Sequence, residues 1–164
     1  MDDNQSPAPP KVADLGAHVP LMTFTHGVMA LDGVTETGWR IVLAGPAHPR
    51  TLESQDKALR LSLKRDQLRE QAQVNGRKYK GEDKDPDDAR RENVEWLVSR
   101  IVDWSPVHVF DRDWPFTDAD AVELLLKPEM GFVRVQLIDR LTEDATFMRR
   151  SATTSSTTRS ATSS

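Results

Sequence analysis

The chain has 164 residues, of which 37% are hydrophobic and 29% charged, and its net charge is −4. This length accommodates one ordinary domain with tails, and the acidic balance argues against a dedicated nucleic-acid-binding protein. The sequence contains no cysteine, which excludes disulfides, zinc–thiolate sites and cysteine nucleophiles. No stretch approaches the roughly 18 apolar residues of a membrane-spanning helix, so we expect no membrane partner.

The two ends of the chain differ in composition from the middle. Residues 1–18 include acidic residues and prolines without a periodic pattern, and residues 151–164 are mostly serine and threonine. Neither segment carries enough apolar side chains to offset the entropy of ordering it. We therefore predict a flexible N-terminal arm over residues 1–18, a single domain over residues 19–150 and a disordered tail over residues 151–164.

Two short segments have the composition of β-strands. Residues 20–26 alternate β-formers at Met22 and Phe24, and residues 39–44 read Trp-Arg-Ile-Val-Leu-Ala before a Gly-Pro pair. Turn-forming residues lie between the two segments, which is typical of a hairpin. The sequence thus predicts a small antiparallel sheet near the N-terminus.

The rest of the domain has helical periodicity. A long stretch free of proline and glycine predicts a helix over residues 51–74 with Asn75-Gly76 as its C-terminal cap. Further helices are predicted from Asp85-Pro86 through Val102, from Thr117 to Pro128, and over 129–141 with Val133, Leu137, Ile138 and Leu141 inward.

A short turn at residues 147–148 follows the last of these helices. The expected fold class is α+β, with a small antiparallel N-terminal sheet packed against a helical C-terminal half of four to five helices. No strand is expected between residues 90 and 140.

The sequence gives little support for catalysis. Asp111 and Asp113 form one pair of carboxylates and Asp118 and Asp120 another, but the second pair is already explained by the first turn of a predicted helix. No nucleophile elbow, phosphate-binding loop or dinucleotide fingerprint is present. We predict that the protein is not an enzyme and uses no cofactor.

The sequence also lacks the spacing of a metal site. None of the four histidines pairs with another at a spacing of three or four residues. The acidic run over residues 83–88 resembles a calcium loop, but Asp88 occupies the glycine position and Val94 replaces the bidentate glutamate. We therefore predict no metal site.

Residues 50–81 are basic, with nine Lys or Arg residues against four acids. They could form a phosphate-facing helix, an interpretation that Tyr79 supports. We favour a solvated helix whose apolar stripes dock on the sheet, with protein-partner electrostatics left open as a third interpretation. The stripes are Leu52, Leu59 and Leu63 on one side, and Leu61, Leu68 and Ala72 on the other.

Three of the four tryptophans lie close together in a chain that is otherwise poor in aromatic residues. Trp104 is predicted to be a core residue, while Trp96 lies off the apolar face of its helix and suits either the core or an interface. Tryptophan and arginine contribute much of the energy at protein interfaces. If the chain binds a partner, we expect an anchor at Trp96, Arg100, Trp104 and Trp114, with Lys57, Arg60 and Lys64 steering the approach.

The second half of the chain resembles small morphogenesis proteins of tailed bacteriophages, and is most similar to tail assembly chaperones. Gly-Pro-Ala-His-Pro at 45–49 and the long basic helix also fit the layout of that family, so the resemblance covers roughly residues 20–152. Its motifs are structural rather than catalytic. It rests on residues 96–107, read as Trp-Leu-Val-Ser-Arg-Ile-Val-Asp-Trp-Ser-Pro-Val, on Pro-Phe-Thr-Asp at 115–118, on the leucine helix ended by Pro128, and on Phe-Met-Arg-Arg-Ser-Ala at 147–152. In that family a further helix follows at this point, whereas this chain has the Ser/Thr tail instead.

The resemblance implies a non-enzymatic role in virion assembly. Tail assembly chaperones hold the tape measure protein, and sometimes tail tube subunits, before these polymerise, so the expected place of action is the host cytoplasm. A permanent virion component, such as a minor capsid, decoration or tail protein, is the first alternative. A DNA-binding accessory protein that uses the basic helix is the second, and homo-oligomerisation is left open.

Overall fold

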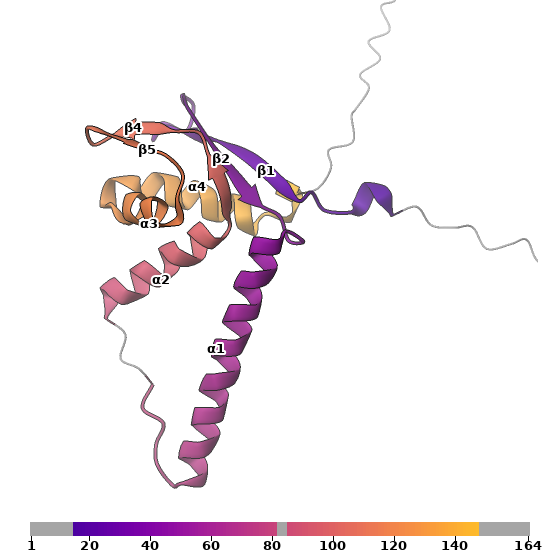
Figure 1. The fold of residues 1–164 in the computed structure, drawn as a ribbon, viewed down its shortest axis with the longest axis vertical. Helices are drawn as coiled ribbons and strands as arrows, with labels where there is room; N and C mark the ends of the chain where they lie inside the picture. The colour runs from indigo at the N-terminus through magenta and orange to yellow at the C-terminus, as the bar shows by residue number, and fades with distance from the viewer. Residues whose placement is uncertain (1–14, 82–84, 148–164) are drawn as a thin grey trace, which may run out of the picture.

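The computed structural model describes residues 15–81 and 85–147 (Figure 1). The predicted tail, most of the predicted arm and Met148 lie outside the described residues. Gly16–His18, at the end of that arm, forms a short 3-10 helix. The main elements in chain order are β1 (Thr23–Met29), β2 (Glu36–Ala44), α1 (Pro49–Val74), α2 (Pro86–Ser99), β3 (Ile101–Trp104), β4 (Val107–Val109), β5 (Arg112–Trp114), α3 (Asp118–Leu126), α4 (Gly131–Thr142) and a final 3-10 turn (Asp144–Phe147).

The predicted fold class is confirmed. An N-terminal antiparallel sheet with the order β1-β2-β3 packs against a helical C-terminal half. In β2, Trp39, Ile41 and Leu43 are buried while Arg40 between them is exposed, which is the alternation of a strand with one covered face. The predicted hairpin is therefore present. Its first strand is displaced by three residues, and its second begins three residues earlier than predicted and ends at Ala44 as predicted.

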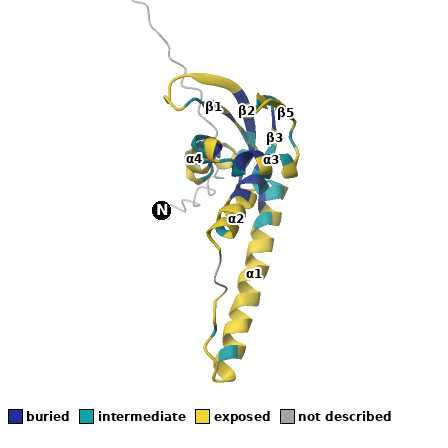
Figure 2. Ribbon diagram, turned by 90° about the vertical axis from the view of Figure 1, so that its left-hand side faces the viewer, coloured by how far each residue is buried: buried dark blue, intermediate teal, exposed yellow. Residues whose placement is uncertain are grey.

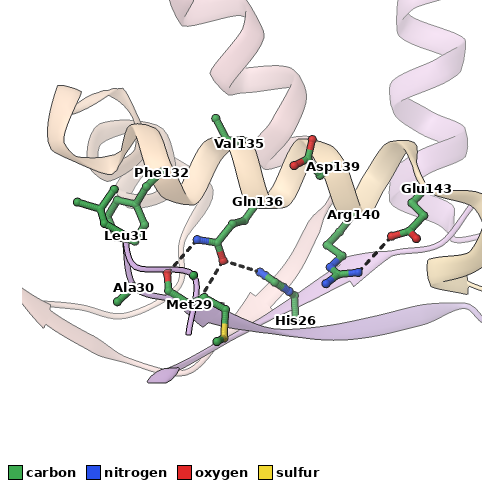
Figure 3. A pocket seen from close by; sticks show the side chains of 11 residues that line it. His26, Met29, Ala30, Leu31, Phe132, Val135, Gln136, Asp139, Arg140 and Glu143 are labelled. Carbon is green, nitrogen blue, oxygen red and sulfur yellow. Dashed lines mark hydrogen bonds and ion pairs between the residues drawn. The ribbon is translucent and has the colours of Figure 1, made fainter. Parts of the chain in front are cut away.

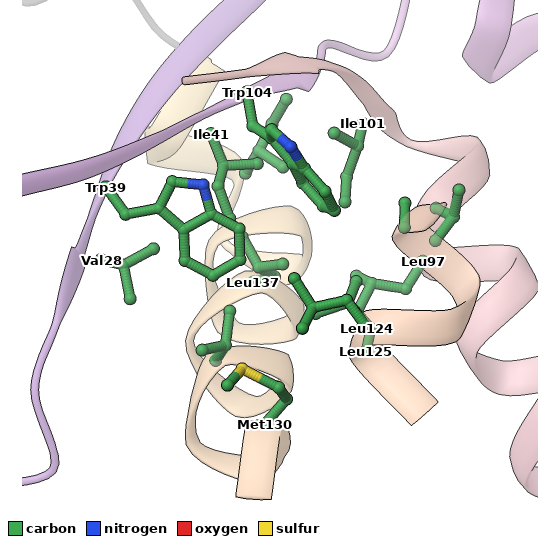
Figure 4. Packing of buried hydrophobic residues seen from close by; sticks show 14 of the residues in the cluster. Val28, Trp39, Ile41, Leu97, Ile101, Trp104, Leu124, Leu125, Met130 and Leu137 are labelled. Atoms are coloured by element: carbon green, nitrogen blue, oxygen red, sulfur yellow. The ribbon is translucent and has the colours of Figure 1, made fainter. Parts of the chain in front are cut away.

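The core lies between the inner face of this sheet and helices α2, α3 and α4. Figure 4 shows Trp39 and Ile41 from the sheet facing Leu137 of α4 and the leucines of α3. Burial of these apolar side chains supplies the main favourable term in folding. The buried set includes Val28, Val94, Leu97, Val98, Ile101, Trp104, Trp114, Leu124, Leu125 and Val133.

The prediction of a helix through Val102 is wrong, because α2 ends at Ser99 and residues 101–104 form the third strand. A β-bulge explains the error. Ile101 pairs with Leu43 and Asp103 pairs with Val42, so Val102 is an extra residue in β3. The bulge lets Ile101 and Trp104, three residues apart, both point inward, and this spacing imitates a helix.

The expectation of no strand between residues 90 and 140 is also wrong for the hairpin of β4 and β5. Its two-residue turn consists of Phe110 and Asp111, with φ angles of 53° and 55°. Turns of this kind normally use Asn-Gly or Asp-Gly, because few other residues adopt left-handed backbone angles at low cost. The sequence therefore carried no recognisable hairpin signal.

The predicted helix ends at Asn75-Gly76, Asp85-Pro86 and Thr117 are confirmed. Asp85 accepts a hydrogen bond from the backbone N–H of Asp87, and Thr117 accepts one from the N–H of Asp120 at 3.0 Å. In α4, Val133 and Leu137 are buried as predicted and Leu141 is partly buried. Ile138 is largely exposed, which corrects its inward assignment, because only the Val133–Leu137 side of α4 meets the core.

Candidate functional site

Within residues 15–81 and 85–147, the hydrogen bonds that attach helix α1 to the domain come from its first turns. Arg50 donates to Asp118 at 2.8 Å and to the carbonyl of Val98 at 3.2 Å. Thr51 is buried, and the hydroxyl groups of Ser54 and Ser99 lie 2.9 Å apart. Beyond Ser54 the helix extends away from the sheet and the other helices (Figure 1).

The leucines of α1 are not covered. Figure 2 shows the helix exposed along most of its length, and its five leucines are 45–59% exposed. The expectation that the apolar stripes dock on the sheet is therefore wrong. The inner face of the sheet is already covered by α2, α3 and α4, so the described part of the domain leaves no free apolar sheet surface for α1.

Two lines of residues run along opposite sides of α1, each with alternating spacings of four and three residues, which keeps a line on one helix face. The α2-facing line starts at Ser54, which contacts α2. It comprises Ser54, Ala58, Leu61, Arg65, Leu68 and Ala72. The outer line comprises Leu52, Asp56, Leu59, Leu63, Asp66 and Glu70.

The charges of α1 are divided between these lines. The outer line itself contains only acidic charges, of which Asp66 lies 3.8 Å from Arg69, whereas the α2-facing line contains Arg65. Further basic residues border both lines. The predicted steering residues Lys57, Arg60 and Lys64 are all exposed, and their spacing of three and four residues aligns them along one side between the two lines. The helix thus offers two apolar surfaces of different charge.

The tryptophans of the predicted anchor do not lie on one surface. Trp96 is 43% exposed on α2, three residues from Ser99 and hence on the side that approaches α1. Trp104 and Trp114 are 3% and 2% exposed, so they belong to the core and not to a surface anchor. They are buried because the bulged β3 strand and the β4–β5 hairpin turn both indoles inward, with Trp104 Nε1 donating to the carbonyl of Trp114 at 3.0 Å.

Arg100 lies at the C-terminal cap of α2, where the chain turns into β3. It is partly buried, and burial lowers the pKa of its guanidinium. Its carbonyl accepts a hydrogen bond from the N–H of Ala44 at 2.7 Å. In the free chain, this residue therefore helps to join α2 to the sheet. Of the four predicted anchor residues, Trp96 is the one that is exposed.

A groove of about 550 Å³ lies between α4 and the first hairpin (Figure 3). The side-chain amide of Gln136 forms its floor, accepting from the N–H of Met29 and donating to the carbonyl of Met29, both at 2.9 Å. The same amide oxygen lies 3.2 Å from Nε2 of His26, so this nitrogen donates. Since Gln136 already bonds to the protein, these groups serve mainly to fasten α4 to β1.

Burial lowers the pKa of His26 below its ordinary value of 6.5, and the positive charge of Arg140 acts in the same direction, while the bond to Gln136 partly opposes both. The unfolded chain therefore binds more protons than the native chain as the pH falls below 6.5. We expect the free energy of unfolding to decrease between about pH 7 and pH 5, and to decrease less in a His26→Gln variant. Urea unfolding at a series of pH values measures both slopes, and equal slopes would contradict the assignment.

Three of the four carboxylates singled out in the sequence, Asp113, Asp118 and Asp120, are hydrogen-bonded or ion-paired to other side chains. Asp113 lies 2.7 Å from Nδ1 of His108, and Asp120 pairs with Arg112 at 2.6 Å. Asp118 holds Arg50 of α1. Within residues 15–81 and 85–147, no three His, Asp or Glu side chains are grouped as a metal site would require. The absence of an enzymatic activity, a metal and a cofactor stays a prediction.

Comparison with protein-family models, curated protein sequences and solved structures finds no match to this chain. None of the helices in the described part has the length and apolar character to cross a membrane. Sequence reasoning missed the groove, because nothing links His26 to Gln136 along a chain that separates them by 110 residues. The difference in charge between the two sides of α1 could have been recognised from the sequence, because residue spacing determines on which side of a helix each side chain lies.

Proposed function

We propose that this chain is a non-enzymatic assembly protein of a tailed bacteriophage, similar to tail assembly chaperones, that holds a helix of a tail protein on α1. The observation that carries the proposal is the exposure of five leucines on a helix anchored only at its start. Exposed apolar surface of this extent is typical of interaction sites. An amphipathic partner helix is the usual occupant of such a surface.

The resemblance of residues 20–152 to tail assembly chaperones supplies the class of partner. Tape measure proteins are long helical rulers, and their apolar seams need cover until the tail tube encloses them. Trp96 adds a partly exposed aromatic side chain on the neighbouring helix, and tryptophan is enriched among the residues that dominate binding energy. The proposed partners are therefore the tape measure protein or the tube protein of the same phage.

The test is copurification of the tagged full chain with each of these two proteins after coexpression. We expect a variant with Leu59, Leu61, Leu63 and Leu68 changed to glutamine to lose at least about tenfold in affinity, since it replaces at once several exposed leucines that the partner would cover. Glutamine retains high helix propensity, so the fold should be preserved. Gln67→Ala, an exposed change on the same helix, is the matched control.

Failure of the wild-type chain to copurify with either protein would contradict the proposal. Mass spectrometry of finished particles separates the alternatives, because a chaperone is absent from them and a virion component is present in many copies. DNA binding that weakens steeply between low and physiological salt would instead favour a nucleic-acid role for the basic side of α1.

A further inference from the structure

The two lines of α1 differ in which other elements of the same chain lie next to them. The α2-facing line begins at Ser54, which meets Ser99 of α2. Glu92 and Trp96 lie seven and three residues before Ser99 and therefore on the same side of α2. The α2-facing line of α1 thus starts at a contact with α2, on a side of α2 that also carries Glu92 and Trp96.

The outer line has no such neighbour among the described elements. Leu59 and Leu63 are more than half exposed, and Leu52, next to the domain, is about half exposed. Asp56 lies between Leu52 and Leu59 on this line, and Asp66 and Glu70 follow Leu63. A helix that covered the leucines would also face these three carboxylates.

A second copy of the chain is a poor occupant of this surface. In an antiparallel pair of outer lines, contact between Leu59 and Leu63 of the two helices would set Asp56 against Asp66. In a parallel pair, each aspartate would face its own counterpart. Both arrangements bring carboxylates together, and like charges at such positions destabilise helix pairing.

We propose that the outer line of α1 binds a basic amphipathic helix of the partner protein, with apolar residues on Leu52, Leu59 and Leu63 and with Lys or Arg opposite Asp56, Asp66 and Glu70. This inference rests on the proposed function, which places the partner on α1, and it adds the side and the charge of the partner. Apolar contact supplies the affinity, and the charges select the partner and accelerate its approach.

The test uses two fluorescent synthetic helices of about 20 residues, a length at which an isolated helix can form. Both have the same leucine seam, bordered by lysine in one peptide and by glutamate in the other. We expect the full chain to bind the lysine peptide at least about tenfold more tightly in fluorescence anisotropy at low salt. The preference should shrink at about 0.5 M salt, where exposed charges are screened.

Variants assign the binding to one side of α1. Asp56→Lys combined with Asp66→Lys should reverse the peptide preference, and Leu59→Gln combined with Leu63→Gln should abolish binding. Leu61→Gln combined with Leu68→Gln is the matched control, because it changes two leucines of similar exposure on the α2-facing line. This control should retain the affinity of the wild-type chain.

Equal affinities for the two peptides, or equal losses in the two leucine pairs, would overturn the inference. If the peptides show no preference while the four-leucine variant still loses the tail protein, the proposed function stands and the inference alone fails. Light scattering tests whether a second copy of the chain occupies the outer line. A dimer of the wild-type chain that disappears in the Leu59→Gln and Leu63→Gln variant would assign the outer line to a second copy and overturn the inference.

Discussion

Replacing Trp104 by alanine is expected to lower the free energy of unfolding by about 3–5 kcal/mol. The rings of Trp39 and Phe116 pack edge to face against this indole, each at 5.2 Å between centroids. Truncation would leave a cavity at this point and remove the donor from the carbonyl of Trp114. Denaturant unfolding followed by circular dichroism measures the loss.

Trp96→Ala is the matched control, since it removes the same side chain from a partly exposed position. We expect it to change the free energy of unfolding by less than about 1 kcal/mol. Under the proposed function, this variant weakens the binding of a tail protein that also contacts the α2-facing side by about 2 kcal/mol, whereas the peptides that bind the outer line should be bound as tightly as by the wild-type chain. Equal destabilisation by the two substitutions would show that Trp96 also contributes to the core in solution.

Gly45→Ala is expected to destabilise the fold by about 3 kcal/mol, at the upper end of the usual cost of overpacking. The N–H of Gly45 donates to the carbonyl of Met22 at 2.7 Å, so the residue lies directly against the backbone of the segment before β1. A Cβ atom at this position would lie far inside contact distance of the backbone oxygen of Leu21. Because backbone cannot turn aside as a flexible side chain can, the end of β2 and the segment before β1 must separate.

The strain would also reach the last turn of the chain, since the N–H of Leu21 donates to the carbonyl of Phe147 at 2.7 Å. Gly27→Ala provides the control for Gly45→Ala. Gly27 lies in β1 with open space where its Cβ would be, and alanine there should change stability by less than about 1 kcal/mol. A drop at Gly27 as large as that at Gly45 would mean that glycine is needed for another reason than close packing.

The local signals in the sequence were sufficient for the fold class and for most helix ends. Thr117 with Asp120, and Asp85 with Pro86, are caps whose chemistry lies within four residues. The Gly76 backbone adopts a φ of 63°, as its position after α1 predicts. Such features depend on neighbouring residues alone, so they could be predicted before the structure was considered.

The third strand shows where local signals fail. Ile101 and Trp104 have the spacing of a helix face, but a bulged strand buries the same two positions. The choice between helix and strand was made by the free edge of β2, which offers backbone hydrogen bonds that a continued helix would leave unused. That edge is more than 50 residues away along the chain.

The sequence by itself determined which residues share a face, because helical and strand geometry follow from spacing. On that basis it placed the leucines of α1 in two stripes and aligned Lys57, Arg60 and Lys64 on one side. Only the tertiary structure decided which faces are covered: Trp104 and Trp114 became core, Trp96 stayed partly exposed, and both stripes of α1 remained open. The physical reason is that burial requires an opposing surface, and the inner face of this small sheet was already filled by three other helices.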